Sequence, residues 1–190
     1  MDNKLSRVQK DETKILDELI ISIGNGDQNA LQTLYYQCKR GIFAVAYAIL
    51  HDYQLAEDVL QETIFKIWEH ASSYRSRRPK AWIYAIARNL SLDMIKQQKC
   101  TVSIEDFEDI PLPEGLVTHV DYDERISLTS GLDCLDHDDA LIIVFKVIVG
   151  LSHLEIAKLL KIPYRTVRYR YQKAISGLKI FLSEPHEHHI

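Results

Sequence analysis

The chain has little of the residue types that define several structural classes. Only three of its 190 residues are cysteine, at positions 38, 100 and 134, and none belongs to a CxxC pair. A disulfide-stabilised scaffold and a zinc knuckle are therefore both poor interpretations. Seven glycines and five prolines are too few for a collagen-like or linker-like chain. No apolar run reaches the roughly 20 residues of a membrane span, and the polar N-terminal segment lacks the apolar stretch of a secretory signal.

What remains has the composition of an ordinary globular protein. Hydrophobic residues make up 46% of the chain and charged residues 26%, which argues against wholesale disorder. Apolar residues recur at helical spacing, and neither strand-like alternation nor an internal repeat is visible, so we expect an all-α fold. A length of 190 residues fits one or two domains. The default expectation is a reduced cytoplasmic protein that needs no cofactor or metal.

The net charge of −4 hides an uneven distribution along the chain. Residues 73–99 carry seven basic side chains against one acidic, and residues 151–183 again carry seven against one, so each block has a net charge of +6. Between them, residues 101–139 carry twelve acidic side chains against one basic, a net charge of −11. Basic blocks attract polyanions through counterion release. They also occur as ordinary solvated helix faces, so charge alone leaves both interpretations open.

The order of the apolar segments predicts two helical bundles. A long helix is expected over residues 30–50 after an N-cap at Asp27, a second over 54–72, and a third over 79–99. Residues 101–129 show no sustained period and contain three turn-forming residues, which predicts a linker with short ordered pieces. The predicted divisions are 1–23 (N-terminal segment), 24–99 (first bundle), 100–131 (acidic linker), 132–183 (second bundle) and 184–190 (tail).

The second bundle carries the pattern of a helix-turn-helix. Residues 141–149 are almost entirely apolar and predict a buried helix, while Ser152 and Glu155 have the spacing of a capping box that opens the next, short helix. A tight turn then leads to Pro163, which suits the first turn of another helix. The inward side chains of the two helices are expected to be Leu154, Ile156, Ala157 and Leu160 in the first and Val167, Tyr171, Ala174 and Leu178 in the second.

The other faces of that last helix carry basic and polar side chains. A basic second helix after a short turn is the arrangement with which helix-turn-helix proteins enter the major groove. Arginine suits this role because its guanidinium binds guanine or phosphate with two parallel hydrogen bonds. The candidate DNA-binding residues are Arg165, Thr166, Arg168, Tyr169, Arg170 and Lys173.

Several segments together resemble the bacterial sigma factors of the extracytoplasmic-function (ECF) group, in the sigma-70 family. Residues 56–68, which read AEDVLQETIFKIW, are similar to the segment that binds the polymerase core. Residues 81–93 are similar to the promoter-reading helix that follows, and residues 150–174 to the C-terminal helix-turn-helix. The resemblance covers about residues 24–182 in the family's order. It implies two helical domains, region 2 and region 4, that bind RNA polymerase core and one promoter.

The resemblance also implies roles for individual residues. The clamp helices of the largest polymerase subunit would contact Asp58, Gln61, Glu62 and Trp68, and the flap of the second-largest subunit is a further expected contact. The −10 element would be opened and read by Arg75, Arg77, Arg78, Lys80, Arg88 and Asn89, with Tyr74 and Trp82 as nearby aromatics for an unstacked base. The −35 element would be read by the six residues of the last helix named above. An anti-sigma factor is implied by the family only.

Three other features enter the interpretation. Asp136, Asp138 and Asp139 place negative charge close to the DNA-binding helix. The histidines of the tail, His186, His188 and His189, are interpreted as a mobile terminus rather than a metal site. Two alternative functions stay open at this point: a free-standing helix-turn-helix regulator and a metal-dependent nucleic-acid hydrolase. The favoured hypothesis is a non-enzymatic sigma factor.

Overall fold

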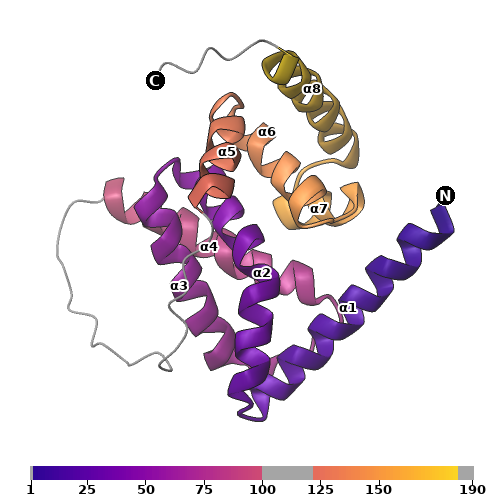
Figure 1. Cartoon of the computed structure of the whole chain (residues 1–190), viewed down its shortest axis with the longest axis vertical. Helices are drawn as coiled ribbons and strands as arrows, with labels where there is room; N and C mark the ends of the chain where they lie inside the picture. Colours follow the sequence, from indigo (N-terminus) through magenta and orange to yellow (C-terminus); the bar gives the residue numbers. More distant parts are fainter. Residues whose placement is uncertain (1, 100–121, 184–190) are drawn as a thin grey trace.

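The computed structural model describes residues 2–99 and 122–183, and every regular element in these ranges is helical. Four long helices form the N-terminal half and a set of shorter ones, followed by a last long helix, forms the C-terminal half (Figure 1). The tail histidines and most of the predicted linker lie outside the described residues. The elements are α1 (Asp2–Gly24), α2 (Gln28–Leu50), α3 (Tyr53–His70), η1 (Ala71–Ser73), α4 (Pro79–Lys99), α5 (Tyr122–Asp133), α6 (His137–Ile143), η2 (Val144–Ile148), α7 (His153–Leu160) and α8 (Tyr164–Ser183).

Capping side chains fix where the helices of the N-terminal half begin. Asp27 accepts hydrogen bonds from the backbone N–H groups of Asn29 and Ala30, at 2.9 and 3.2 Å, as the sequence predicted. Asp52 does the same for α3 by accepting from the N–H of Leu55 at 2.9 Å. Between these helices, His51 adopts a left-handed conformation with φ of 48° and ends α2. The short connection makes α2 and α3 antiparallel neighbours.

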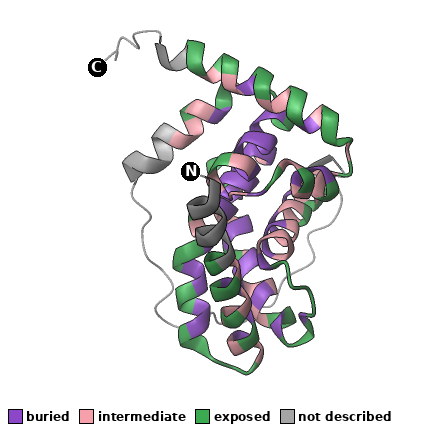
Figure 2. Ribbon diagram, turned by 90° about the vertical axis from the view of Figure 1, so that its right-hand side faces the viewer, coloured by how far each residue is buried: buried purple, intermediate pink, exposed green. Residues whose placement is uncertain are grey.

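The helix α2 is the centre of the molecule. Residues 41–49 are all buried, so this stretch is covered on every side. At Gly41 the helix α4 comes so close that an added Cβ would lie 2.5 Å from the Tyr84 hydroxyl oxygen. The remaining sides of the stretch are covered by α3 and, from the C-terminal half, by α6 and η2. The buried side chains of both halves therefore form one continuous core (Figure 2).

The helix α1 was not anticipated as part of the first bundle. It packs Leu16, Ile20 and Ile23 into the core against α2, where they are 0–5% exposed. The spacing of these residues, i, i+4 and i+7, was the available signal in the sequence. Its exposed apolar residues, Ile15 and Ile21, lie on other faces of the helix.

The helix-turn-helix has the predicted local structure. Ser152 and Glu155 form the complete capping box, with the Ser152 N–H donating to the Glu155 carboxylate at 2.8 Å and the Glu155 N–H donating to Ser152 Oγ at 3.3 Å. Lys161 ends α7 in a left-handed conformation, and α8 follows Pro163 directly. Val167 and Ala174 of α8 are buried as expected. The helix-turn-helix is thus α7 and α8.

Two expectations about this half were wrong in detail. Leu154 is 54% exposed rather than inward-facing, because Ile156 and Ala157 define the buried face of α7 and Leu154 lies in its first turn on another side. The apolar stretch 141–149 is α-helical only to Ile143; η2 continues it as a π-helix that leaves Val147 59% exposed. In addition, α5 occupies the end of the segment expected to be the linker.

The capping box makes a first testable prediction. Replacing Ser152 by alanine removes the acceptor of the Glu155 N–H, and we expect it to lower the free energy of unfolding by about 0.5–2 kcal/mol. The measurement is urea denaturation followed by circular dichroism. Lys158→Ala is the matched control, since this residue is exposed in the middle of α7 and alanine favours helix there. Equal midpoints for the two variants would contradict the capping role.

Candidate functional site

The residues that resemble the polymerase contact lie along α3. Asp58 and Glu62 are one helical turn apart and half-exposed, and Gln61 is exposed. Asp58 accepts a long hydrogen bond of 3.5 Å from Gln54, and Glu62 lies 3.9 Å from the Lys66 ammonium group. Contacts this long between exposed groups contribute little to stability. The acidic face of α3 is therefore accessible to a partner.

Trp68 differs from the other three residues of this set. It is half-buried and packs against the core of the N-terminal half. The same residue therefore supports the bundle and remains partly accessible at the end of the acidic face. The structure brings all four residues onto one helix.

The basic residues of the predicted −10 region divide into two groups. Arg75, Arg77, Arg78 and Asn89 are exposed. The Arg75 guanidinium also donates to the backbone oxygens of Ser72 and Tyr74, at 2.9 and 2.8 Å, which shapes the loop before α4. This group presents three guanidinium groups and one amide to solvent.

The second group, Lys80 and Arg88, faces the rest of the protein. The Lys80 ammonium group donates to Glu12 of α1 and to the backbone oxygen of Val149, both at 3.0 Å, and only 19% of the side chain is exposed. Arg88 is half-buried on α4, and its Nε has no hydrogen-bond partner within the described part of the chain. Both side chains point toward the C-terminal half.

The aromatic residues near this loop form a small cluster. Tyr74 is only 9% exposed, its hydroxyl donates to Asp17 of α1, and its ring centroid lies 5.0 Å from that of Trp82. Burial and the Asp17 carboxylate together raise the pKa of Tyr74. Trp82 is half-buried and packs against the core. The role of Glu12 and Asp17 in holding Lys80 and Tyr74 was missed from the sequence, because it depends on the docking of α1.

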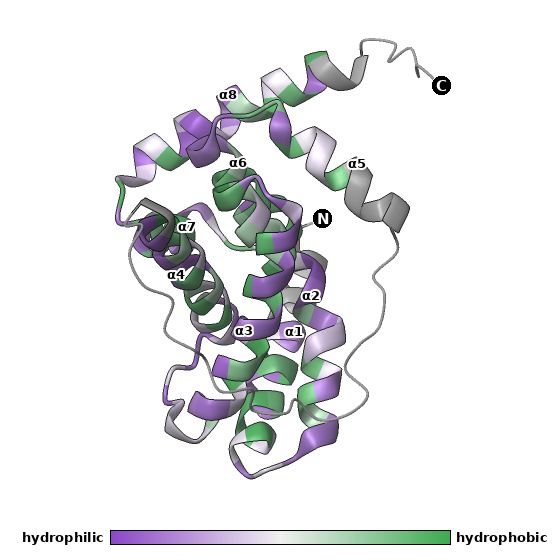
Figure 3. Cartoon of the chain, turned by 90° about the vertical axis from the view of Figure 1, so that its left-hand side faces the viewer, coloured by the Kyte–Doolittle hydropathy of each residue, from purple (hydrophilic) through white to green (hydrophobic). Residues whose placement is uncertain are grey.

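The outer face of α8 carries the predicted −35 residues. Arg165, Arg168 and Lys173 are exposed, and Tyr169 is 69% exposed. Figure 3 shows hydrophilic residues concentrated along the N-terminal part of this helix. Thr166 is half-buried and faces α6 and α7 rather than open solvent. The helix therefore offers a basic and aromatic surface beside the turn.

Acidic residues at the N-terminus of α6, one at its N-cap and two in its first turn, contact two of these side chains. Arg170 donates to Asp138 at 2.5 Å and lies 3.9 Å from Asp139. Lys173 lies 3.3 Å from Asp139 and 3.5 Å from Asp136. The hydrogen bond to Asp138 raises the pKa of Arg170, and the one to Asp139 raises that of Lys173. The sequence predicted that these three aspartates lie close to the DNA-binding helix. It did not predict which basic residues they would contact.

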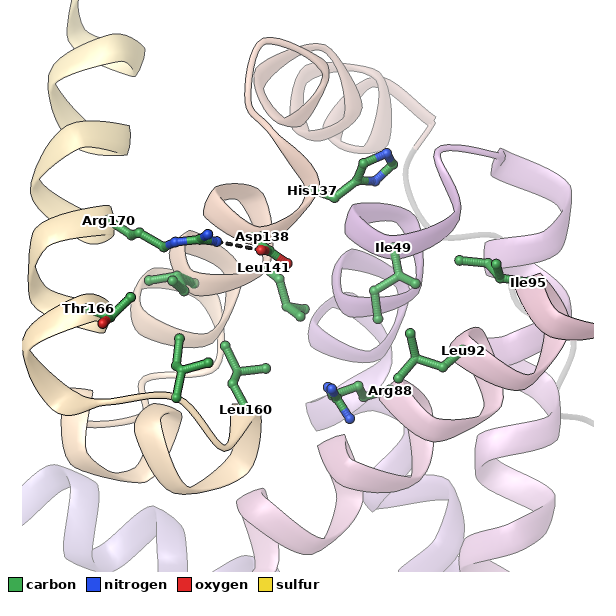
Figure 4. Close-up of a pocket in the computed structure, with 12 residues that line it drawn as sticks. Ile49, Arg88, Leu92, Ile95, His137, Asp138, Leu141, Leu160, Thr166 and Arg170 are labelled. Atoms are coloured by element: carbon green, nitrogen blue, oxygen red, sulfur yellow. Dashed lines mark hydrogen bonds and ion pairs between the residues drawn. The ribbon is translucent and has the colours of Figure 1, made fainter.

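A cavity of about 300 Å³ lies between the two halves. Seven of its twelve lining residues are aliphatic, and they come from α2, α4, α6, α7 and the turn after α7. Figure 4 shows Arg88 on one side of this space and Thr166 and Arg170 on the other, with Asp138 bonded to Arg170. Candidate residues for the two promoter elements thus line the same cavity.

Comparison with known proteins decides the family. The Sigma-70 region 2 family matches residues 34–101, and the Sigma-70 region 4 family matches residues 125–176. The chain belongs to the sigma-70 family of RNA polymerase sigma factors, in its ECF group. The first matched range contains residues 56–68 and 81–93, and the second contains residues 150–174; these are the segments that resemble the family. The free-standing regulator is accordingly not favoured.

Individual relatives agree with this assignment. The chain is 27% identical over 167 residues to the ECF RNA polymerase sigma factor SigE of Mycolicibacterium smegmatis, covering 84% of this chain and 65% of that protein. It is 27% identical over 180 residues to the ECF RNA polymerase sigma factor SigW of Bacillus subtilis, covering 87% of this chain and 95% of SigW. The sigma factor therefore spans slightly less than two thirds of SigE and nearly all of SigW.

Solved structures share the fold. CnrH, in complex with the cytosolic domain of CnrY, superposes with a TM-score of 0.60 at 22% identity, over 88% of this chain and 97% of CnrH. RpoE of Bartonella quintana, in complex with the anti-sigma factor NepR, gives a TM-score of 0.58 at 23% identity, over 82% and 98%. The predicted all-α architecture with two helical parts is confirmed. None of the helices in the described ranges is long and apolar enough to span a membrane.

Proposed function

We propose that this ECF sigma factor binds RNA polymerase core and directs promoter-specific initiation through contacts with the −10 and −35 elements. The observation that carries the proposal is the presence, in one chain, of an accessible acidic face on α3 and an accessible basic face on α8. The polymerase supplies the catalysis, and the sigma factor contributes positioning and strand opening. Its place of action would be the cytoplasm, with the chromosome.

The polymerase contact is assigned to Asp58, Gln61, Glu62 and Trp68. Carboxylates and an amide at the edge of an apolar helix suit a partner helix that carries arginines, since charge-assisted hydrogen bonds then surround an apolar contact. The half-buried Trp68 would supply the apolar part of this surface. The clamp helices of the largest subunit are the proposed partner of α3, and the flap of the second-largest subunit that of the C-terminal half.

The promoter contacts are assigned to two separate surfaces. In the −10 region, Arg75, Arg77, Arg78 and Lys80 would neutralise phosphates, while Arg88 and Asn89 contact the opened strand. In the −35 region, the exposed Arg165, Arg168 and Tyr169 are the best placed to reach base edges. Thr166, Arg170 and Lys173 would join them, with Lys173 on phosphate.

Regulation by an anti-sigma factor is proposed on the basis of two relatives. CnrH was solved with the cytosolic domain of CnrY, and RpoE with the anti-sigma factor NepR. A protein that covers the acidic face of α3 would prevent polymerase binding. The acidic segment between the two halves is proposed as the connector that runs through the RNA-exit path of the polymerase.

Transcription with purified components tests the proposed function. Core polymerase plus this chain is expected to initiate at specific promoters, which are identified by selecting bound sequences from a random pool. A free-standing regulator would bind DNA without conferring initiation on core. A hydrolase would cleave labelled DNA in the presence of Mg²⁺ without polymerase. Either of these two results, with no promoter-specific transcript, would overturn the proposal.

The role of α8 makes a residue-level prediction. Arg168→Ala is expected to weaken binding of the holoenzyme to the −35 element by about 1–3 kcal/mol, if the side chain makes a bidentate base contact. The measurement compares the affinities for promoters with an intact and a scrambled −35 element. Lys158→Ala removes a basic, exposed side chain from α7 and serves as control. Unchanged promoter preference in the Arg168 variant would remove this residue from the reading set.

A further inference from the structure

The cavity between α2, α4 and the C-terminal helices combines an aliphatic wall with one cationic side chain. Most of its lining residues are aliphatic, among them Ile49, Leu92 and Leu160. Arg88 projects into the same space from α4 (Figure 4). A mostly apolar wall with a few polar groups is typical of sites that bind small molecules. The contacts proposed above with polymerase and DNA make no use of the aliphatic part of this wall.

Arg88 lacks an acidic neighbour in the cavity. Its Nε is inaccessible to solvent and has no hydrogen-bond partner among residues 2–99 and 122–183. Asp138 is the only acidic side chain among the described residues that line the cavity, and it accepts from Arg170 of α8 on the opposite side (Figure 4). A buried N–H without an acceptor costs free energy, and a bound anion would offset that cost.

The charges in the wall favour an anion with a single negative charge. Asp138 balances Arg170, which also lies 3.9 Å from Asp139. The ring of His137 packs edge-on against His51, with 4.2 Å between the ring centroids. This leaves the guanidinium of Arg88 as the group without a counter-charge. One guanidinium matches one carboxylate, whereas a phosphate group with a charge close to −2 would bring an unbalanced charge into an apolar space.

The volume of the cavity sets the size of the ligand. An apolar cavity of about 150 Å³ holds a benzene ring. The cavity here has a volume of about 300 Å³, so by the same ratio it holds about twelve non-hydrogen atoms. An unbranched carboxylic acid of about eight to ten carbons has this size, and its tail matches the aliphatic wall.

We propose that the cavity binds an unbranched aliphatic monocarboxylate of about eight to ten carbons. The carboxylate accepts hydrogen bonds from the Arg88 guanidinium, and the tail lies among the aliphatic side chains of α2, α4, α6 and α7. Binding of this acid does not depend on the proposed function, because a chain that fails to direct transcription with core polymerase would still hold the cavity and its guanidinium group.

Isothermal titration calorimetry of the full chain with sodium octanoate tests the site. We expect one saturable site per chain. From hexanoate to decanoate the affinity is expected to rise about fourfold for each methylene group, the fold-change that corresponds to about 0.8 kcal/mol. The rise should stop before tetradecanoate, because the cavity is then full. The proposal is overturned if neither octanoate nor decanoate shows saturable binding, or if the affinity rises steadily to tetradecanoate, as in adsorption to an open surface.

The contact with Arg88 is tested with a charged and an uncharged ligand. Octan-1-ol has the chain length of octanoate without the charge. Arg88→Gln is expected to weaken octanoate binding at least about 10-fold, since it removes a charge-assisted hydrogen bond, and octan-1-ol binding less than about threefold. Lys96→Gln removes one positive charge from an exposed position of the same helix, and both affinities should stay within about twofold. Equal losses for the two ligands in Arg88→Gln would contradict the carboxylate contact.

The location of the ligand is tested by filling the cavity. Leu92→Trp adds bulk to the wall and is expected to weaken the binding of octanoate and octan-1-ol alike, by at least about 10-fold. Leu154→Trp is the matched control, since this side chain is 54% exposed on α7 and does not line the cavity. Circular dichroism shows whether the variants are folded, and Leu160→Phe fills the cavity from α7 if Leu92→Trp is not. Wild-type affinity in a folded, filled variant would overturn the site.

Discussion

Reversing the charge of Asp58 to arginine lowers the affinity of the sigma factor for core polymerase by at least about 100-fold, if α3 meets a partner helix that carries arginines. Bringing like charges together across an interface costs several kcal/mol. The fold is expected to survive the substitution because Asp58 is half-exposed and its hydrogen bond to Gln54 is long. The affinity is measured by titrating labelled sigma factor with purified core, and the variant is checked by circular dichroism.

The control for Asp58→Arg is a variant with the same change of charge at a position outside α3. Asp11→Arg makes the same change at an exposed position of α1, outside the segment that resembles the polymerase contact. It is expected to change the affinity for core less than about threefold, since exposed charges at a distance are screened by salt. Adding Glu62→Arg to Asp58→Arg should weaken binding further. Co-elution of the double variant with core at wild-type affinity would contradict the assignment of α3.

Truncating Phe43 to alanine is expected to lower the free energy of unfolding by about 3–5 kcal/mol. This side chain in the middle of α2 is 2% exposed. Its ring stacks on Tyr47 with 6.0 Å between centroids and meets Tyr53 of α3 edge-on at 5.2 Å. The loss combines the transfer of the ring to water with the cavity that it leaves behind. Urea denaturation followed by circular dichroism gives the free energy.

An aromatic residue of the same helix provides the comparison for Phe43. Tyr36 is 45% exposed and packs edge-on against Tyr35 at the surface. Tyr36→Ala is expected to lower the free energy of unfolding by less than about 1 kcal/mol, because little buried area is lost. Similar losses for Tyr36→Ala and Phe43→Ala would show that α2 is not packed in solution as the structure has it.

The features that were predictable from the sequence are those that depend on neighbours a few residues away. The N-cap at Asp27 and the capping box of Ser152 and Glu155 were both predicted, and both are formed. The buried face of α8 followed from the spacing of Val167 and Ala174. The helical spacing wrongly placed Leu154 on the buried face of α7. In this helix of only eight residues, the buried side is determined by two inward positions, Ile156 and Ala157.

Candidate site residues could be named from the sequence, but their arrangement in space could not be predicted from it. Four of the five basic residues of α8 were named as candidates, yet their accessibility divides them: Arg168 is exposed, while Arg170 is held by Asp138. Lys80 was likewise identified and bonds instead to the backbone of Val149, 69 residues away in the sequence. The family assignment rests on local motifs, which is why the sequence was sufficient for it.

The sequence by itself determined the helices α2, α3 and α4, the caps at Asp27 and Ser152, the helix-turn-helix and membership of the sigma-70 family, because each depends on side chains within one or two helical turns of one another. Only the tertiary structure decided which charged groups remain available to partners and how the two halves pack. Those outcomes depend on contacts such as that between Tyr47 and Asp133, which are 86 residues apart. Pairing across such a separation is set by how all the apolar faces fit together, and no local pattern specifies it.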